Sequence, residues 1–259
     1  MDKLLIVKLG GKILEQQELL DQFIDFYAAY PHPKILIHGG GKQATAYAEK
    51  LGVETKMVEG RRITDKPMLD VALMTYAGLL NKSLVAQINA RGEKAIGVTG
   101  ADGNLIVSDK RPPGAVDYGF VGDIRSVQAE TFKTLLDAGL PPVVCALTHD
   151  QKGQMLNTNA DAVANAIAQG LQANYTVELW LCMDLPGVLE NIEEPESLLA
   201  EISPKRYTEL KSAGKIHQGM IPKLDTAFAS LDAGVDTVYI SNVEALLNPN
   251  HSKTRIVQA

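Results

Sequence analysis

Short apolar runs of strand length recur along the chain, and longer segments of helical period separate them. The runs are rich in Ile, Val and Leu and mostly lack alternation, which is typical of central strands in a parallel sheet covered on both faces. They lie at 4–9, 34–38, 95–99, 143–147, 176–183 and 237–240. The helical segments lie at 17–30, 43–51, 67–90, 129–138, 161–171 and 222–233. This alternation predicts an α/β fold, a three-layer αβα sandwich around a central, mainly parallel sheet with right-handed crossovers.

Two stretches interrupt the alternation. Residues 103–122 contain Arg-Pro-Pro-Gly at 111–114 between short polar strand-like pieces, which predicts a β-hairpin insertion that acts as a flap over a site. Residues 187–204 are rich in Glu and are interpreted as an acidic, solvated surface loop. The helix at 67–90 is apolar on more than one face, so it is buried either in the core or across a subunit interface. Periodicity alone does not distinguish burial in the core from burial across a subunit interface.

Composition narrows the class of protein further. The 259 residues are 46% hydrophobic and carry a net charge of -6, which excludes a disordered or collagen-like chain and gives no indication of a nucleic-acid partner. Any bound phosphate must therefore be held locally. Cys145 and Cys182 lie in apolar runs typical of unpaired thiols in a reducing compartment. With no signal peptide and no membrane-spanning run, we expect a soluble cytoplasmic protein.

Two glycine turns directly follow strands. The first is Lys-Leu-Gly-Gly-Lys at 8–12 and the second is His-Gly-Gly-Gly-Lys at 38–42. Neither has the spacing of a Walker P-loop or of a dinucleotide fingerprint. Glycines let backbone N–H groups approach an anion, and the helix that follows adds the positive end of its dipole. The two turns could hold one anion between them, although plain tight turns, and a solvated role for Lys8, remain alternatives.

Two further clusters open helices. Asn-Thr-Asn-Ala-Asp at 157–161 offers more polar groups than helix capping requires, so some are free to face a ligand, although capping by Thr158 or Asn159 is the structural alternative. Gly-Met-Ile-Pro-Lys at 219–223 places Lys223 near a helix N-terminus. A cation is disfavoured there unless an anion or an Asp compensates its charge, which indicates that Lys223 binds a phosphate.

Taken together, the motifs resemble those of the N-acetylglutamate kinases of the amino acid kinase family. The matches are in order and span nearly the whole chain, although no single motif is strong. They are Lys-Leu-Gly-Gly at 8–11, His-Gly-Gly-Gly at 38–41, Gly-Arg-Arg-Ile-Thr at 60–64, Gly-Ala-Asp-Gly at 100–103, Gly-Phe-Val-Gly at 119–122, Asn-Thr-Asn-Ala-Asp at 157–161, Asp-Leu-Pro-Gly-Val at 184–188 and Gly-Met-Ile-Pro-Lys at 219–223.

The resemblance implies transfer of the γ-phosphoryl group of ATP to the side-chain carboxylate of an N-acylated glutamate, in arginine or ornithine synthesis. Lys8 and Lys223 would flank the transferring group and Asp161 would hold both lysines. Mg²⁺ would bridge the ATP phosphates, with no metal ligands from the protein. The N-terminal lobe, 1–173, would bind N-acylglutamate and form the dimer, and the C-terminal lobe, 174–259, would bind ATP.

The resemblance also assigns binding residues. Arg62 would clamp the fixed α-carboxylate, a bidentate task that Lys performs poorly, whereas Arg61 beside it is interpreted as a surface charge. The other substrate contacts would be Gly40, Gly41, Asn157 and Asn159. The nucleotide contacts would be Gly10, Gly11, Asp184, Gly187, Lys215, His217, Gly219 and Met220.

Some positions depart from the family pattern. Met183 stands where a Ser or Thr is usual before the nucleotide loop, which removes a hydroxyl contact to ATP. The run Cys-Ala-Leu-Thr-His at 145–149 is also unusual, so the acyl group stays open. An N-succinylglutamate substrate would want a donor such as His149 or Lys152. Because the chain lacks the N-terminal helix of arginine-inhibited hexamers, the resemblance implies an arginine-insensitive homodimer that pairs through the helix at 67–90.

Two other hypotheses about the function stay open. Within the family, the chain could phosphorylate aspartate, carbamate or UMP, although it has no room for the regulatory domains of aspartate kinases. From a different class, it could be a catalytically silent binding or regulatory subunit. The presence of Lys8, Asp161 and Lys223 favours an enzyme.

Overall fold

A single large sheet organises the molecule. The computed structural model describes residues 1–11, 13–58, 60–216 and 220–258, and its main sheet has eight strands in the order β12-β14-β13-β11-β1-β2-β8-β5. They are β12 (Glu201–Ile202), β14 (Thr254–Ile256), β13 (Thr237–Ser241), β11 (Thr176–Cys182), β1 (Lys3–Leu9), β2 (Lys34–His38), β8 (Pro142–Cys145) and β5 (Ile96–Val98). All neighbours are parallel except β13 and β14. The six predicted apolar strands are confirmed, and the sheet is mainly parallel.

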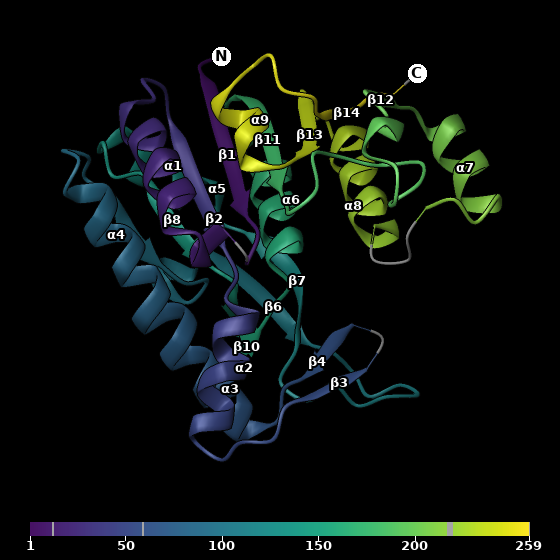
Figure 1. Cartoon of the computed structure of the whole chain (residues 1–259). Coiled ribbons are helices and arrows are strands. Elements are labelled where there is room, and N and C mark those ends of the chain that lie inside the picture. The colour runs from purple at the N-terminus through teal and green to yellow at the C-terminus, as the bar shows by residue number, and fades with distance from the viewer. Residues whose placement is uncertain (12, 59, 217–219, 259) are drawn as a thin grey trace.

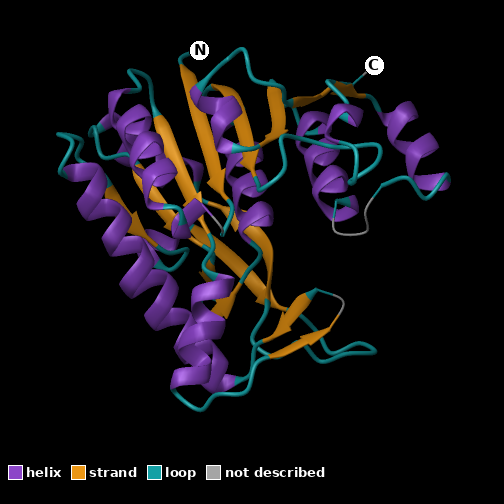
Figure 2. Ribbon diagram, viewed as in Figure 1, coloured by secondary structure: helices purple, strands orange, loops and turns teal. Residues whose placement is uncertain are grey.

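Helices cover both faces of this sheet, as Figures 1 and 2 show. Successive side chains of β1 point to opposite faces, because a strand has a period of two. Leu5 and Val7 pack with α1 (Gln17–Ala29), α4 (Asn81–Asn89) and α9 (Val243–Leu247). Leu4 and Ile6 pack in the other core with α5 (Ala129–Asp137), α6 (Ala160–Leu171), α7 (Pro204–Ser212) and α8 (Ile221–Asp232). The predicted three-layer αβα sandwich is confirmed.

A second, four-stranded sheet lies beyond one edge of the main sheet, in the lower part of Figure 1. Its order is β10-β9-β6-β7, with β10 (Met155–Asn157), β9 (Leu147–His149), β6 (Ile106–Lys110) and β7 (Gly122–Val127). The antiparallel pair β6 and β7 is the predicted hairpin. Bridges from Gly119 to Thr64 and from Val121 to Asn157 tie the loop of this hairpin to neighbouring segments.

A second hairpin, β3 (Lys56–Val58) and β4 (Arg61–Ile63), was not predicted from the sequence. Each strand has only three residues and is largely exposed, so neither carries an apolar run that would indicate a strand. The hairpin nevertheless places Arg62 beside α2 (Gly41–Lys50), which begins at the last glycine of the second glycine turn.

The predicted helix at 67–90 is continuous but changes its hydrogen-bonding pattern along its length. It consists of α3 (Lys66–Ala72), a π-helical segment η2 (Leu73–Leu80) and α4. One face is in the core, whereas Met74 and Leu79 on η2 are exposed in the single chain. The π-helical turns matter for the site, because Tyr76 and Leu80 reach the second glycine turn from them.

The acidic stretch at 187–204 is exposed to solvent at residues 191–196, as predicted, but it also contains local secondary structure. It contains a bridge between Leu189 and Leu198, a short 3₁₀ turn η4 (Pro195–Ser197) and strand β12. Two other 3₁₀ turns, η1 (Ile13–Glu15) and η3 (Asp102–Asn104), follow β1 and precede β6. The proposed lobe boundary near residue 173 falls between α6 and β11. The main sheet continues across this boundary, from β1 to β11, and the division into two lobes stays a prediction. Within the described ranges, the helices are too short or too polar to cross a bilayer.

Candidate active site

The site lies at the carboxyl edge of the main sheet. Because β1 runs parallel to both β2 and β11, their C-terminal ends meet at one edge, and the register pairs Leu9 with His38 and Lys8 with Leu181. The chain leaves β1 toward β2 on one side and returns to β11 on the other, so β1 is a topological switch point. Ligands of open α/β sheets bind at such a point.

Two lysines and one aspartate meet at this edge. The Nζ atom of Lys8 lies 2.7 Å from Oδ1 of Asp161, and Lys223 donates a hydrogen bond to Oδ2 of the same carboxylate. The side chains of Lys8 and Asp161 are each 11% exposed, and that of Lys223 is 23% exposed. Three segments far apart in the sequence therefore place one carboxylate between two ammonium groups.

The electrostatics of this trio fix its charge state. Burial by itself would raise the pKa of Asp161, but the neighbouring charges of Lys8 and Lys223 outweigh burial and hold the pKa well below its ordinary value. Burial and the nearby Lys8 ammonium lower the pKa of Lys223, and Asp161 opposes that shift. The trio carries one more positive than negative charge when all three groups are ionised, which suits a polyanion.

Local structure positions each member. The side chain of Asn159 caps α6, accepting hydrogen bonds from the N–H groups of Asp161 and Ala162 at 2.8 and 3.1 Å. Asp161 therefore sits in the first helical turn, where a carboxylate is favoured. Pro222 lies in the first turn of α8, and Lys223 follows it. The compensating anion expected for Lys223 is supplied by the protein itself, through Asp161.

The glycines of the two turns serve different purposes. A Cβ added at Gly40 would lie 2.5 Å from Leu80 Cδ1 and 2.6 Å from Tyr76 Cδ1, so packing against η2 already requires a glycine there. A Cβ at Gly10 would be tight against the Cys182 carbonyl at 3.2 Å. By contrast, a Cβ at Gly11 would meet nothing within 4 Å. Packing against η2 therefore accounts for the glycine at position 40 without a ligand.

Two predicted substrate residues, Arg62 and Asn157, each form a hydrogen bond with a threonine. Arg62 donates from Nη2 to the Gly41 carbonyl and to Thr45 Oγ1, both at 2.8 Å. Among the described residues it forms no ion pair with a carboxylate. Asn157 Nδ2 donates to Thr64 Oγ1 at 3.0 Å. Thr45 and Thr64 were not predicted, because nothing in the sequence marks a single Thr as the partner of a distant side chain.

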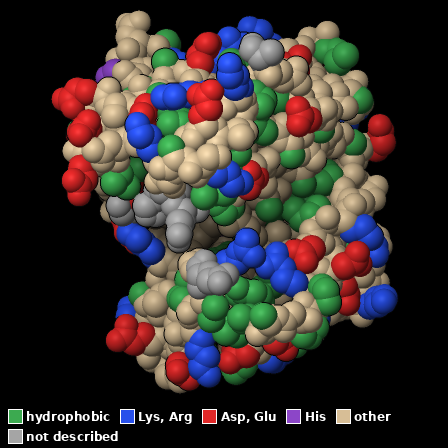
Figure 3. All heavy atoms as spheres, turned by 90° about the vertical axis from the view of Figure 1, so that its right-hand side faces the viewer, with side chains coloured by type: hydrophobic (Ala, Val, Ile, Leu, Met, Phe, Trp, Pro, Cys, Tyr) green, Lys and Arg blue, Asp and Glu red, His purple; other side chains and the backbone are tan. Residues whose placement is uncertain are grey.

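A hollow lies between the upper and lower parts of the face in Figure 3, with Lys and Arg side chains at its edge. On the C-terminal side, a pocket of about 260 Å³ has ten lining residues. They are Leu185, Val188, Leu189, Glu190, Asn191, Ile192, Gly214, Lys215, Ile216 and Met220. The predicted nucleotide residues Lys215 and Met220 are among them. In this structure Lys215 forms an ion pair with Glu190 at 2.5 Å.

The remaining predicted nucleotide residues differ in what the structure says of them. A Cβ at Gly187 would lie 2.5 Å from Thr254 Oγ1, so the packing of β14 accounts for this glycine. Asp184 acts electrostatically on Lys223, raising its pKa against the effect of burial and of Lys8. His217 and Gly219 lie outside the described residues.

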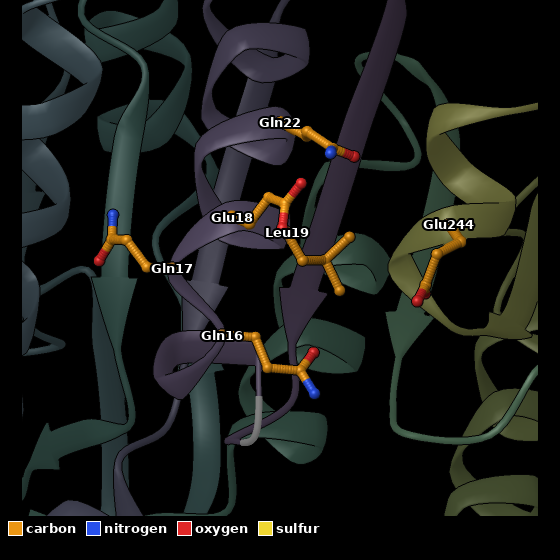
Figure 4. Close-up of a pocket in the computed structure, with 6 residues that line it drawn as sticks. All are labelled: Gln16, Gln17, Glu18, Leu19, Gln22 and Glu244. Atoms are coloured by element: carbon orange, nitrogen blue, oxygen red, sulfur yellow. The ribbon is translucent and has the colours of Figure 1, made fainter.

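A second hollow and the two cysteines, all among the described residues, lack the chemistry of this site. A hollow of about 400 Å³ between the start of α1 and α9 is lined by Gln16, Gln17, Glu18, Leu19, Gln22 and Glu244. Figure 4 shows Gln17 pointing away from Glu244, and no lining side chain is a cation that could bind phosphate. Burial raises the pKa of the Cys145 and Cys182 thiols to about 12, so neither is a nucleophile.

Comparison with known proteins defines the class. The model of the amino acid kinase family matches residues 3–242, and the chain belongs to this family. It is 47% identical to acetylglutamate kinase of Cytophaga hutchinsonii over 98% of this chain and 97% of that protein. It is 40% identical to acetylglutamate kinase of Methanopyrus kandleri over 93% of this chain and 96% of that protein.

Solved structures share the fold. N-acetylglutamate synthase from Neisseria gonorrhoeae, in complex with coenzyme A and N-acetyl-glutamate, matches with a TM-score of 0.80 at 22% identity, over 100% of this chain and 60% of that one. Carbamate kinase from Giardia lamblia bound to AMP-PNP matches with a TM-score of 0.68 at 17% identity, over 100% and 99%. At these identities the likeness concerns the fold alone.

Proposed function

We propose that this chain transfers the γ-phosphoryl group of ATP to the side-chain carboxylate of N-acetyl-L-glutamate, giving N-acetyl-L-glutamyl 5-phosphate and ADP, in arginine biosynthesis. The observation that carries the proposal is the pair of lysines around Asp161 at the switch point of the sheet. Membership of the amino acid kinase family and the names of the relatives, which are similar over nearly their whole length, support it.

The trio meets the needs of phosphoryl transfer. A carboxylate oxygen of the substrate attacks the γ-phosphorus while the bond to the β-phosphate oxygen breaks, and catalysis consists of positioning and of neutralising charge on the transferring group. Lys8 would act on the attacking side and Lys223 toward the leaving β-phosphate, with Asp161 holding both. N–H groups of the turns at Gly10, Gly11, Gly40 and Gly41 would complete the cradle.

Mg²⁺ would enter with ATP and neutralise part of the phosphate charge. Both oxygens of Asp161 are already engaged by lysines, so this carboxylate does not suit a metal ion as a ligand. Among the described residues there is also no cluster of three or more His, Cys, Asp or Glu suited to a metal. The residues present therefore fit a metal held through the ATP phosphates rather than by the protein.

Substrate and nucleotide would bind on opposite sides of the trio. Arg62 has five donors in a planar fork and lacks a carboxylate partner among the described residues, so it suits the fixed α-carboxylate of the substrate. Asn157 and the exposed Asn159 would contact the rest of the acylated amino acid. The half-apolar pocket around Lys215 and Met220 would take the base of the nucleotide. Asp184, Gly187, His217 and Gly219 stay proposed nucleotide contacts.

We extend the proposal to the setting of the enzyme. The two free, buried thiols suit a reducing compartment such as the cytoplasm. The exposed Met74 and Leu79 on η2 suit a homodimer that pairs through this helix.

A phosphorylation assay tests the function. The purified chain, ATP and Mg²⁺ are combined with N-acetyl-L-glutamate, N-succinyl-L-glutamate, L-glutamate or L-aspartate, and acyl phosphate is trapped with hydroxylamine. We expect the highest kcat/KM with N-acetyl-L-glutamate. Equal kcat/KM for the N-succinyl compound would contradict a pocket specialised for the acetyl group, and turnover of aspartate alone would replace the proposal by another activity of the family.

A further inference from the structure

His38 is a buried polar residue at the edge of the site that the mechanism above does not use. It ends β2, directly before the glycine turn, and its side chain is fully buried. Its Nδ1 atom lies 2.8 Å from the Gly39 carbonyl oxygen, and its Nε2 atom lies 3.1 Å from Nδ2 of Asn81. Both ring nitrogens thus have a partner in the protein interior.

The partners determine where the proton of the ring lies. A carbonyl oxygen only accepts, so Nδ1 carries the hydrogen that is donated to Gly39. Asn81 Nδ2 also donates to the Val143 carbonyl at 2.9 Å, and Asn81 Oδ1 accepts from Lys82 Nζ at 3.2 Å. The amide orientation is therefore fixed, and Nε2 of His38 accepts. Burial keeps the ring neutral, because it lowers the pKa of His38 to about 4.

The surrounding backbone is shaped around this pair. A Cβ at Gly97 would lie 2.0 Å from Asn81 Oδ1, so a glycine in β5 leaves room for the amide. Asn81 is the first residue of α4 and directly follows η2, the segment that packs Tyr76 and Leu80 against Gly40. One rigid helix therefore contacts the glycine turn both through packing and through the His38 ring.

From these contacts we infer that His38, held by Asn81, is a positioning residue that sets the orientation of the glycine turn for the acyl amino acid. The peptide between Gly39 and Gly40 is planar, so the bond from His38 to the Gly39 carbonyl also fixes the direction of the Gly40 N–H group. Two residues further along the turn, the Gly41 carbonyl accepts from Arg62 at 2.8 Å. His38 thus acts on two proposed substrate contacts without touching substrate. The inference rests on the proposed function for the identity of the substrate.

Two isosteric substitutions separate positioning from stability. In His38→Asn the amide nitrogen can take the place of Nδ1 and keep the hydrogen bond to the Gly39 carbonyl, but the hydrogen bond with Asn81 is lost. In His38→Gln the side-chain amide reaches the place of Nε2 and keeps the hydrogen bond with Asn81, but the hydrogen bond to the Gly39 carbonyl is lost. Both remove the same buried ring and should lower the melting temperature comparably. We expect KM for N-acetyl-L-glutamate to rise about tenfold in His38→Gln and to change less than about twofold in His38→Asn.

The matched control is Asn89→Ala, on the same helix α4. Asn89 accepts from the Ala95 N–H at 2.7 Å and donates to the Ala95 carbonyl at 3.2 Å, away from the glycine turn. Its loss should lower the melting temperature and leave KM unchanged. Equal KM values in His38→Gln and His38→Asn, or a rise in His38→Asn alone, would overturn the inference.

A spectroscopic measurement keeps the inference testable without activity. In ¹⁵N NMR of the wild-type chain, with the His38 signals assigned from their loss in His38→Asn, Nδ1 should be protonated and Nε2 bare. A proton on Nε2 would overturn the inference even in a fully active enzyme. If the wild type fails to phosphorylate N-acetyl-L-glutamate, the proposed function fails, while the protonation pattern of the ring is still measured.

Discussion

Lys8 at the end of strand β1 and Asp161 in the first turn of helix α6 lie with their charged atoms 2.7 Å apart, although more than half of the chain separates them. The even-numbered side chains of β1 face the layer that contains α6, so the strand period directs the Lys8 side chain toward this helix. The carboxylate that Lys8 meets is shared with Lys223. The predictions that follow examine this arrangement and the residues around it.

Asp161→Asn should lower kcat by about 10² to 10³, because two ammonium groups would be left without the carboxylate that orients them. Steady-state kinetics with N-acetyl-L-glutamate and ATP measure the effect. Asp70→Asn removes the same charge from an exposed ion pair with Lys66 and serves as the control, with no expected change. A kcat within about twofold of wild type for Asp161→Asn would contradict the role of this residue.

Lys8→Ala should remove several kcal/mol, about 3 to 5, of transition-state stabilisation while substrate still binds. The reason is that the charge of Lys8 is needed most when negative charge spreads over the transferring group. Single-turnover rates and binding of N-acetyl-L-glutamate by calorimetry distinguish catalysis from binding. Unchanged turnover would remove Lys8 from the mechanism.

Arg62→Lys should raise KM for N-acetyl-L-glutamate by about tenfold to a hundredfold with a smaller effect on kcat, because an ammonium group cannot bind a carboxylate in a bidentate manner. Arg61→Lys on the same strand is the matched control, since Arg61 is exposed and no function is assigned to it. The two variants are compared by initial-rate kinetics at saturating ATP. A similar KM in both would argue against Arg62 as the carboxylate clamp.

Gly40→Ala and Gly11→Ala should have opposite consequences. The added methyl group at Gly40 meets Leu80 and Tyr76, so this variant should lose about 1 to 3 kcal/mol of unfolding free energy. The methyl group at Gly11 has open space, so that variant should keep its stability and raise KM for ATP if the turn approaches the phosphates. Urea denaturation and initial rates measure the two effects. An unchanged free energy of unfolding for Gly40→Ala would show that Tyr76 and Leu80 of η2 move aside at little cost.

Stability should fall as the pH falls from about 6.5 to about 4. Burial lowers the pKa of His38 from 6.5 to about 4, so in this window the unfolded chain binds a proton that the folded chain does not. The loss from this one residue is about 3 kcal/mol once the pH is below both values. Urea denaturation at several pH values measures it, and His38→Asn should have a flatter profile. Equal slopes for wild type and variant would contradict the assignment.

Much of the architecture followed from local patterns. The six central strands, the helices α1, α2, α5, α6 and α8 and the long helix at 67–90 were predicted, because a buried parallel strand needs an unbroken apolar run and an amphipathic helix needs its own period. The helices α7 and α9 were not predicted. A hairpin was predicted at 103–122 from its turn residues, and the observed one extends further, because its second strand β7 occupies Gly122–Val127. Short exposed strands such as β3 and β4, and the acidic segment that includes β12, carry no such pattern and were not predicted.

Local sequence motifs place Lys8, Asp161, Lys223 and the two glycine turns at the end of a strand or the start of a helix, and the resemblance to the family points to Arg62. The packed structure was needed to show that one carboxylate holds both lysines, that η2 requires the glycine at position 40, and that Asn81 holds His38. These are contacts between residues far apart in the chain, and their geometry depends on how whole layers pack. Local propensity specifies each element but not its partner.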